Sequence, residues 1–557
     1  MNYSIQTACV SSLEKIYPDQ APQNRISSGS MLRNELYSFQ VAYKCTTENH
    51  RILLSIEVDG GLQDYITIRE VGLVPSDLPV YSSFDSDYER TTPGLFPDPL
   101  YPIPTNGLPA LNLAGWRSIW ISIDPIDGFI PSGKYDLLIR FIDNEDKTEV
   151  ASEVYKLHVI DALLPKQELK YTCWIYLDCI ADHYNIEMYS QLFWDRTEQF
   201  IRTAVKHGIN TILTPIVTPP LETAYGKERP TTQLVDIYKE NDNYTFGFDN
   251  LIRFVDICKG SGVEYYEICH LFSQWGCKYA PKIMAEENGE YKRIFGWETD
   301  ASSPEYVTFL KQLLSSLREC LIKLEIEDKC LYHVSDEPSY DQRLEYKHGR
   351  DLIAEVLGDV PVIDAMSDYG LYSEGYVTTP VPSIDSIQPF IEGGVKNLWG
   401  YYCCGQTHDV SNRFFSMPSS RNRIIGLQLY KFDLEGFLQW GYNFYYSQQS
   451  LEKINPFLVT DGRLAYPSGD AFSVYPGVDG PIESLRLVVF YEGISDLRAC
   501  RLLEKLKGRQ YVISLIEEEA GAPLTFAQYP KGQNFILSLR EKINHEIELA
   551  MISETHK

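Results

Sequence analysis

The segment HVSDEPS, residues 333 to 339, places two carboxyl groups, Asp336 and Glu337, between an apolar run and Pro338. Neighbouring residues in a regular strand point to opposite faces, but a break in the pleat at Pro338 lets both side chains reach one cleft. Paired carboxyl groups in a cleft are suited to acid catalysis and charge stabilisation, as in glycoside hydrolysis. The alternative is an acidic loop that lies in water where the strand ends.

Polar and aromatic side chains also follow the other apolar runs of this part of the chain. Aromatic rings pack on the C–H faces of sugars, and a few polar groups bind the hydroxyls. We therefore predict a carbohydrate site, although each aromatic side chain alone is equally compatible with the core. The predicted substrate-binding residues are Asp178, His270, Trp399, Tyr401, Trp440, Tyr442 and Asn443.

The run NLWGYYC, residues 397 to 403, ends without a carboxylate, although many barrel glycosidases carry their nucleophile at the end of the seventh strand. This absence favours a nucleophile supplied by the substrate, such as a 2-acetamido group. In that mechanism Glu337 protonates the glycosidic oxygen and Asp336 orients the amide. A conventional enzyme that uses Asp364, Glu298 or Glu435 as its nucleophile remains an alternative.

From about residue 170, strand-like runs alternate with helical stretches such as EYVTFLKQLLSSLRECLIKL, whose apolar residues recur every three and four positions. This alternation predicts a (β/α)8 barrel of the TIM type, with the active site at the carboxyl ends of its strands. An open doubly wound sheet is the alternative, but no Gly-rich phosphate loop follows the first strand. The predicted strands are residues 171–178, 210–216, 264–270, 330–336, 360–366, 383–389, 397–403 and 436–442.

The regions on either side of the predicted barrel have different patterns. Residues 1–165 contain short alternating segments such as RSIWISID and KYDLLIRFID, which are typical of an antiparallel β-sandwich. We assign residues 166–445 to the barrel. Residues 446–557 contain loops rich in Pro and Gly followed by helical segments, which we expect to pack on the outside of the barrel. The fold class is therefore multidomain α/β.

The composition of the chain narrows its partners. The 50 Lys and Arg residues against 77 Asp and Glu residues give a net charge of −27, which disfavours nucleic acids and anionic membranes. No segment is apolar enough for membrane insertion, and the N-terminal sequence lacks the pattern of a signal peptide, so we expect a cytoplasmic protein. The 12 cysteines are read as reduced, buried thiols, and no metal or cofactor motif is found.

Beyond the Asp336 and Glu337 pair, the stretches NLWGYYCCG, SRNRIIGLQLYKFDLEGFLQWGYNFY, PSGDAFSVYPG and SLRLVVFYEGISDLRACRLLE resemble glycoside hydrolase family 123. The resemblance covers roughly residues 170 to 505. It implies a β-N-acetylgalactosaminidase with a β-sandwich ahead of a barrel, in which the Asp-Glu motif is catalytic. The implied enzyme is a retaining, exo-acting hydrolase that removes terminal N-acetylgalactosamine through an oxazolinium intermediate.

Other functions remain open at this stage. Within hydrolases, the alternatives are a β-N-acetylglucosaminidase and a glycosidase with two catalytic carboxylates. Outside them, they are a catalytically silent carbohydrate-binding protein and a scaffold whose sandwich mediates oligomerisation. The adjacent acids Asp336 and Glu337 argue against the last two, because their mutual repulsion costs stability that a binding protein has no need to lose. The oligomeric state is not predicted.

Overall fold

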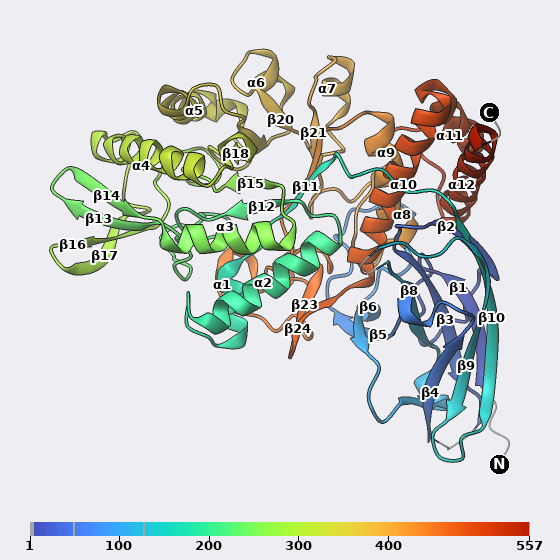
Figure 1. The fold of residues 1–557 in the computed structure, drawn as a ribbon. Helices are drawn as coiled ribbons and strands as arrows, with labels where there is room; N and C mark the ends of the chain where they lie inside the picture. Colours follow the sequence, from blue (N-terminus) through green and yellow to red (C-terminus); the bar gives the residue numbers. More distant parts are fainter. Residues whose placement is uncertain (1–4, 48–50, 126–127, 556–557) are drawn as a thin grey trace.

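The computed structural model of the chain describes residues 5–47, 51–125 and 128–555. Its N-terminal part contains two five-stranded sheets, in the orders β1-β3-β8-β5-β6 and β2-β10-β9-β4-β7 (Figure 1). Strands β2 and β10 pair in parallel, whereas the other neighbours in these sheets are antiparallel. The strands are β1 (Ile5–Ser11), β2 (Ser28–Leu32), β3 (Tyr37–Cys45), β4 (Arg51–Asp59), β5 (Ile66–Ser76), β6 (Gly94–Pro102), β7 (Leu108–Leu111), β8 (Arg117–Ile123), β9 (Gly133–Asp143) and β10 (Glu149–Ile160).

The two sheets share a core because alternate residues of their strands face each other. In β9, Leu137, Ile139 and Phe141 are fully buried and their neighbours are more exposed, which is the period of two expected for a half-buried strand. Across the interface, the rings of Phe39 and Tyr155 stack with centroids 4.1 Å apart. The expected β-rich N-terminal region is therefore confirmed.

A second sheet system forms the centre of the molecule. Six parallel strands lie in the order β18-β15-β12-β11-β22-β21, and β19 and β20 form a separate parallel pair. Single parallel bridges join Tyr332 to Val362 and Ser383 to Tyr401, so the pair lies between β18 and β21. These strands are β11 (Lys170–Cys173), β12 (Thr211–Thr214), β15 (Tyr265–Ile268), β18 (Cys330–Tyr332), β19 (Ile363–Ala365), β20 (Thr379–Val381), β21 (Trp399–Tyr401) and β22 (Gly436–Gln439).

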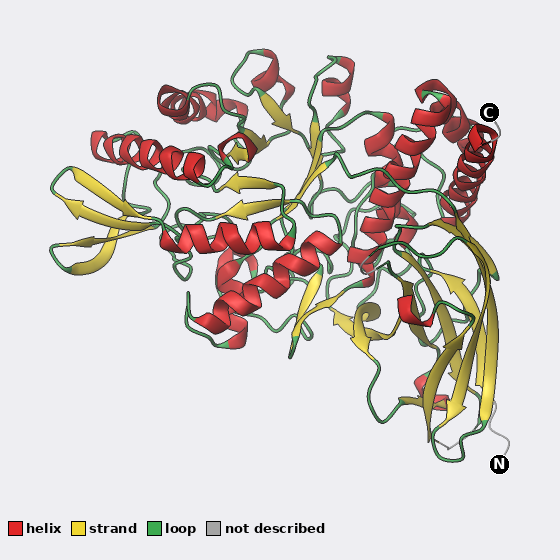
Figure 2. Cartoon of the chain, in the orientation of Figure 1, coloured by secondary structure: helices red, strands yellow, loops and turns green. Residues whose placement is uncertain are grey.

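Helices flank this central sheet, as Figure 2 shows, and their sequences explain where they begin. In α4, the Ser303 hydroxyl caps the helix by accepting from the Tyr306 amide, and Pro304 occupies the first turn. The helices of this part are α1 (Leu177–Tyr184), α2 (Gln191–Lys206), α3 (Asp249–Ser261), α4 (Pro304–Lys323), α5 (Arg343–Leu357), α6 (Tyr369–Ser373), α7 (Gln388–Glu392), α8 (Ser419–Arg423) and α9 (Ile425–Lys431).

Most of the predicted central strands overlap observed ones, but the prediction for residues 383–389 is wrong. The parallel strand at this point is β20, which ends at Val381, and residue 388 begins helix α7. Pro380 and Pro382 hid β20, because proline is rare inside strands. Gln388 therefore belongs to a helix and not to a strand end. The first predicted strand also stops earlier than expected, at Cys173.

Two further elements complete the fold. A four-stranded sheet that the sequence did not predict projects away from the N-terminal sheets (Figure 1); it contains β13 (Asp236–Glu240), β14 (Asn243–Gly247), β16 (Ile283–Glu287) and β17 (Glu290–Phe295). The expected C-terminal helices are present. After the hairpin of β23 (Val474–Gly477) and β24 (Gly480–Glu483) come α10 (Leu485–Lys507), α11 (Arg509–Ala520) and α12 (Gln533–Thr555). Helix α10 packs on α8, α9 and α12 and also contacts β6, so it connects the two sheet systems.

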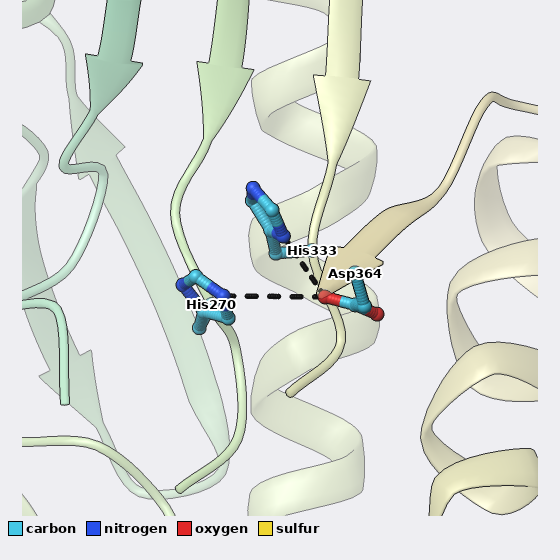
Figure 3. A group of neighbouring side chains, drawn as sticks. All are labelled: His270, His333 and Asp364. Atoms are coloured by element: carbon cyan, nitrogen blue, oxygen red, sulfur yellow. Dashed lines mark hydrogen bonds and ion pairs between the residues drawn. The ribbon is translucent and has the colours of Figure 1, made fainter. Parts of the chain in front are cut away.

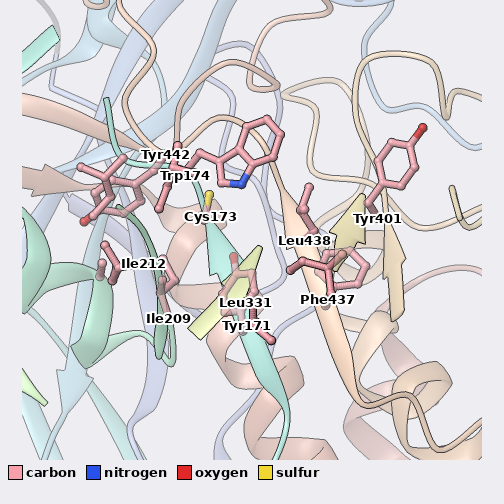
Figure 4. Close-up of a cluster of buried hydrophobic side chains, with 14 of the residues drawn as sticks. Tyr171, Cys173, Trp174, Ile209, Ile212, Leu331, Tyr401, Phe437, Leu438 and Tyr442 are labelled. Atoms are coloured by element: carbon pink, nitrogen blue, oxygen red, sulfur yellow. The ribbon is translucent and has the colours of Figure 1, made fainter. Parts of the chain in front are cut away.

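The central core is continuous and apolar, as the close-up in Figure 4 shows for Tyr171, Ile212 and Phe437. Strands β12, β18 and β22 are buried along their whole length, as expected for parallel strands covered on both faces. Within the described ranges, no helix has the length and apolar character needed to cross a bilayer. The domain boundaries at 165 and 445 stay predictions.

Candidate active site

Asp336 and Glu337 line one pocket beyond the carboxyl ends of the central strands. The loops after β11, β12, β15, β18, β21 and β22 supply most of its walls, together with residues of strands β19, β21 and β22. This is the side where parallel α/β enzymes place their sites. The cavity volume is about 100 Å³. The lining residues are Trp174, Tyr176, Leu221, Glu222, Gln274, Trp275, Asp336, Glu337, Ala365, Tyr401, Cys403, Cys404, Leu438, Trp440 and Tyr466.

Asp336 is the buried member of the pair, with 7% of its surface exposed. The Gln274 side chain donates from Nε2 to Asp336 Oδ2 at 2.7 Å, while its own Oε1 accepts from the Glu222 amide at 2.9 Å. The second bond fixes which end of the Gln274 amide faces Asp336. Burial, and then the charge of Glu337, raise the pKa of Asp336 well above its ordinary value.

Glu337 is the exposed member of the pair, and its backbone explains its orientation. Its φ is 47°, a left-handed conformation that is uncommon outside glycine and interrupts the alternation of a strand. The Glu337 amide donates to the Ala365 carbonyl at 3.0 Å, which ties this turn to the neighbouring strand β19. The Tyr401 hydroxyl donates to Glu337 Oε1 at 2.8 Å. Both carboxyl groups are thus held toward the same pocket by partners from other strands.

A buried ion network lies directly before the pair, at His333. Its Nδ1 donates to Asp364 Oδ1 at 2.9 Å and its Nε2 donates to Glu267 Oε1 at 2.5 Å. Burial would lower the pKa of His333, but the hydrogen bonds to the two carboxylates outweigh it and raise the pKa to about 10. His333 is therefore a cation at neutral pH. Glu267 also accepts from the indole of Trp174 at 2.8 Å, so the network supports the pocket wall.

His270 stacks on His333, as Figure 3 shows, with ring centroids 4.0 Å apart and planes 20° from parallel. Burial, and then the charge of His333, lower the pKa of His270 well below its ordinary value. His270, His333 and Asp364 each offer a possible metal ligand atom within 4.8 Å of the others. Stacked rings cannot both direct their in-plane lone pairs at one ion, and both nitrogens of His333 already face carboxylates. The arrangement therefore fits an ion network better than a metal centre.

Several predicted substrate-binding residues are buried away from the pocket. Asp178 lies in helix α1, where Arg229 donates to both of its carboxylate oxygens at 2.7 and 2.8 Å. Trp399 packs flat over Gly436, where a Cβ atom would lie 2.2 Å from its ring. The charge of Asp178 is thus balanced by Arg229, and the Trp399 side chain fills the core. Neither lines the pocket.

Tyr442 and Asn443 also have structural partners. The Tyr442 hydroxyl donates to the carbonyl of Phe200 at 3.0 Å. Asn443 bridges the backbone of Tyr176, accepting from its amide at 2.8 Å and donating to its carbonyl at 3.1 Å. With His270, these residues support the pocket from behind and do not line it.

Trp440 and Tyr401 are the predicted substrate-binding residues that line the pocket. The half-buried indole of Trp440 donates to Asp470 Oδ2 at 2.9 Å and lies edge-on to Tyr466, with centroids 5.3 Å apart. Tyr466 and Asp470 belong to the segment that the sequence placed outside the barrel. Their segment shows neither strand nor helix periodicity, so the pattern did not place them at the pocket, although Asp470 lies in the family-like stretch PSGDAFSVYPG. Gln274 and Trp275 could have been predicted as pocket residues, because they closely follow the predicted strand at residues 264–270.

A third carboxylate, Glu222, also lines the pocket. Its Oε2 accepts from the Tyr466 hydroxyl at 2.7 Å and from the Gln449 amide at 3.1 Å. By contrast, Asp364 is fully buried in the His333 network, Glu298 pairs with Arg293 at 3.0 Å, and Glu435 pairs with Lys170. None of those three lines the pocket. Among the pocket-lining carboxylates outside the Asp336 and Glu337 pair, Glu222 is therefore the candidate for a conventional nucleophile.

Cys403 and Cys404 are half-buried at the pocket wall, and both are free thiols. A hydrogen bond with Cys404, and then burial, raise the pKa of Cys403 well above its ordinary value. A thiol nucleophile needs the opposite shift, because the thiolate is the reactive form. The other ten cysteines are buried free thiols, as expected.

The fold and the site together define an α/β enzyme with a carboxyl pair in an aromatic-lined pocket at strand ends. The family model described as "Glycoside hydrolase 123, catalytic domain" matches residues 174–503. The chain therefore belongs to glycoside hydrolase family 123. Membership makes it a glycosidase and implies a carbohydrate substrate.

A solved structure of the same family agrees with this chain at the level of the fold. A family 123 glycoside hydrolase from Clostridium perfringens, studied for glycolipid glycan hydrolysis, is 14% identical, with a TM-score of 0.73 over 99% of both chains. A family 39 glycoside hydrolase from Bacteroides cellulosilyticus is 10% identical, with a TM-score of 0.34 over 84% of this chain and 81% of that one. No curated protein sequence matches the chain.

Proposed function

We propose that this protein is a retaining, exo-acting glycosidase that removes terminal β-linked N-acetylgalactosamine with the help of the sugar's own acetamido group. The observation that carries the proposal is the placement of Asp336 and Glu337 in one pocket, each with a separate hydrogen-bond donor. Family membership and the C. perfringens relative, which acts on glycolipid glycans, support a glycan substrate.

Glu337 is the general acid. Its proton passes to the glycosidic oxygen as the bond from that oxygen to the anomeric carbon breaks. The acetamido carbonyl oxygen attacks the anomeric carbon from the opposite face and forms a cyclic oxazolinium ion. Glu337, now a carboxylate, then takes a proton from the water that opens this ring, which restores the acid and retains the configuration at the anomeric carbon.

Asp336 orients the acetamido group by accepting its N–H. Burial, and then the charge of Glu337, raise the pKa of Asp336 well above its ordinary value before substrate binds. An incoming N–H donor stabilises the ionised form of Asp336, and so does the amide of Gln274. Substrate binding thereby favours the ionised form of Asp336. The Asp336 charge then opposes the positive charge that develops on the oxazolinium ring.

The rest of the pocket suits a single terminal sugar. Trp174, Trp275 and Trp440 offer apolar ring surfaces for a pyranose. The cavity volume of about 100 Å³ is below the range of roughly 300–1,000 Å³ found for larger ligands. A pocket of this size favours binding of a chain end over an internal segment of a glycan.

The same proposal extends to the scaffold. We infer that the eight parallel strands β11, β12, β15, β18, β19, β20, β21 and β22 form a (β/α)8 barrel. The bridges from Tyr332 to Val362 and from Ser383 to Tyr401 support this inference, because they join the β19 and β20 pair to the six-stranded sheet on both sides.

The test compares three chromogenic glycosides: β-N-acetylgalactosaminide, β-N-acetylglucosaminide and β-galactoside. We expect turnover of acetamido sugars only, with the galactosaminide preferred. Glu337→Gln and Asp336→Asn should each lower kcat/KM by about two orders of magnitude or more. Equal cleavage of the galactoside, together with loss of activity in Glu222→Gln, would instead establish a conventional enzyme with two catalytic carboxylates.

A further inference from the structure

An exposed group of aromatic side chains lies beside the pocket and outside it. Tyr225, Tyr279 and Trp297 form this aromatic cluster, with ring centroids 5.4 Å, 5.4 Å and 6.1 Å apart. Tyr225 is 68% exposed, and the other two rings are partly exposed. Single exposed aromatic residues are ordinary, but a contiguous group of them marks a binding surface.

The loop after β12 carries Tyr225, the loop after β15 carries Tyr279, and Trp297 follows β17. The first two loops also line the pocket, through Glu222 and Gln274. At the pocket they are joined by the hydrogen bond from the Glu222 amide to Gln274 Oε1. They meet again where Tyr225 packs against Tyr279. Tyr225 is three residues beyond Glu222, so its Cα lies within about 11 Å of the Cα of that pocket residue. The aromatic cluster is therefore within reach of a glycan whose terminal sugar occupies the pocket.

The backbone holds the rings in place. The Trp297 indole donates to the Lys227 carbonyl at 2.9 Å, and the Tyr279 amide donates to the Ser273 hydroxyl at 3.1 Å. Trp275, 47% exposed at the edge of the pocket, has a φ of 58°, which is rare for a bulky residue and typical of ligand sites. Trp275 at the edge of the pocket and Tyr279 in the cluster therefore lie four residues apart on the loop after β15.

We propose that the aromatic cluster is a second sugar-binding subsite, which holds a sugar on the leaving-group side of the cleaved bond. This inference rests on the proposed function and names its substrate class: an oligosaccharide with a terminal acetamido sugar. The ring of Tyr225 packs on the C–H face of that second sugar. Substrates with a simple aryl leaving group gain nothing from this contact.

The experiment measures kcat and KM for two substrates, the chromogenic β-N-acetylgalactosaminide and a tetrasaccharide that ends in β-linked N-acetylgalactosamine. Tyr225→Ala should raise KM for the tetrasaccharide about tenfold and change the values for the chromogenic substrate less than about twofold. Tyr225→Phe should restore the tetrasaccharide KM, because it keeps the ring. Tyr291→Ala is the matched control, since Tyr291 is 64% exposed and lies on β17, outside the aromatic cluster.

The outcomes separate this inference from the function on which it rests. Suppose that the unmodified protein cleaves both substrates, but that Tyr225→Ala leaves kcat/KM unchanged for both or lowers it equally for both. The subsite is then wrong and the proposed function stands. If Tyr291→Ala reproduces the tetrasaccharide defect, the aromatic cluster has no special role and the inference is also wrong. If the unmodified protein cleaves neither substrate, the proposed function fails, and the subsite falls with it.

Discussion

Two charged clusters follow one another at the end of strand β18 and differ in how fully their polar atoms are paired. In the first, His333 is enclosed by Glu267 and Asp364, and the other oxygen of Asp364 accepts from Tyr346 at 2.7 Å. In the second, Asp336 and Glu337 each have one side-chain donor and face a pocket. The first cluster has little capacity left for a ligand, whereas the second keeps free acceptor sites for one.

This difference distinguishes charged groups that stabilise the fold from charged groups that act on a ligand. A network whose members satisfy one another fixes the shape of the strand end, and removing one member leaves a buried charge without a partner. A pair that repels itself and remains open to a cavity is costly unless a ligand uses it. Each variant below changes one cluster, and the measurement is of stability, of activity or of both.

The largest expected effect is on stability, from Asp364→Ala. His333 loses one of its two carboxylate partners and Tyr346 loses its acceptor, so the free energy of unfolding should fall by about 3–5 kcal/mol. Denaturant unfolding followed by circular dichroism measures this loss. Asp364→Asn, which keeps an acceptor of the same shape, should be less harmful. A loss below about 1 kcal/mol for Asp364→Ala would show that the network does not support the fold.

The next largest effect is expected from Glu337→Gln, which should lower activity strongly and stability only slightly. Glu337 is exposed and accepts one side-chain hydrogen bond, so unfolding should change by less than about 1 kcal/mol. The loss of two or more orders of magnitude in kcat/KM corresponds to about 2.7 kcal/mol or more of transition-state stabilisation. An equal loss of stability would place Glu337 with the supporting network instead.

A smaller effect is expected from Gln274→Ala, which removes the donor to Asp336. This hydrogen bond lowers the pKa of Asp336, so its loss raises that pKa further. Because the mechanism needs ionised Asp336, the acidic limb of the pH profile should move to higher pH, with a drop of about tenfold in kcat/KM near neutral pH. Gln274→Glu, which adds a charge at the same position, should shift the limb further. An unchanged pH profile in Gln274→Ala would contradict a role for Gln274 in setting the pKa of Asp336.

The last expected effect is on the pH dependence of stability, and it comes from His333. Its pKa is raised from an ordinary value of 6.5 to about 10 in the folded protein. The stabilisation is therefore complete below pH 6.5 and is lost as the pH rises toward 10. Thermal unfolding should show a Tm that falls between pH 7 and pH 9.5. The fall should be weaker in His333→Gln, which carries no charge to lose.

The sequence predicted the parallel strands where a buried apolar run ends in polar residues, as at residues 330–336, and it placed Asp336 and Glu337 at the correct end of the fold. It misplaced β20 because Pro380 and Pro382 obscure the strand, and it extended β11 too far because the chain stays apolar into helix α1. The local sequence pattern therefore does not show where a strand ends within an apolar run, or where a strand contains prolines.

The same limit explains why some predicted substrate-binding residues do not line the pocket. Asp178 and Asn443 follow predicted strands, as catalytic residues do, yet their partners Arg229 and Tyr176 come from distant parts of the chain. Tyr466 reaches the pocket from a segment without periodicity. Pairing across such distances is set by tertiary packing, so only the folded chain distinguishes a buried partner from a side chain that faces the pocket.

The most direct test of the central claim alters the acetamido group itself. A series of chromogenic galactosaminides with N-acetyl, N-fluoroacetyl, N-difluoroacetyl and N-trifluoroacetyl groups weakens the carbonyl oxygen as a nucleophile step by step without changing the leaving group. If that oxygen attacks the anomeric carbon beside Asp336 and Glu337, kcat/KM must fall steeply with each added fluorine. Values that stay level across the series would contradict the account and assign the attack to a protein carboxylate.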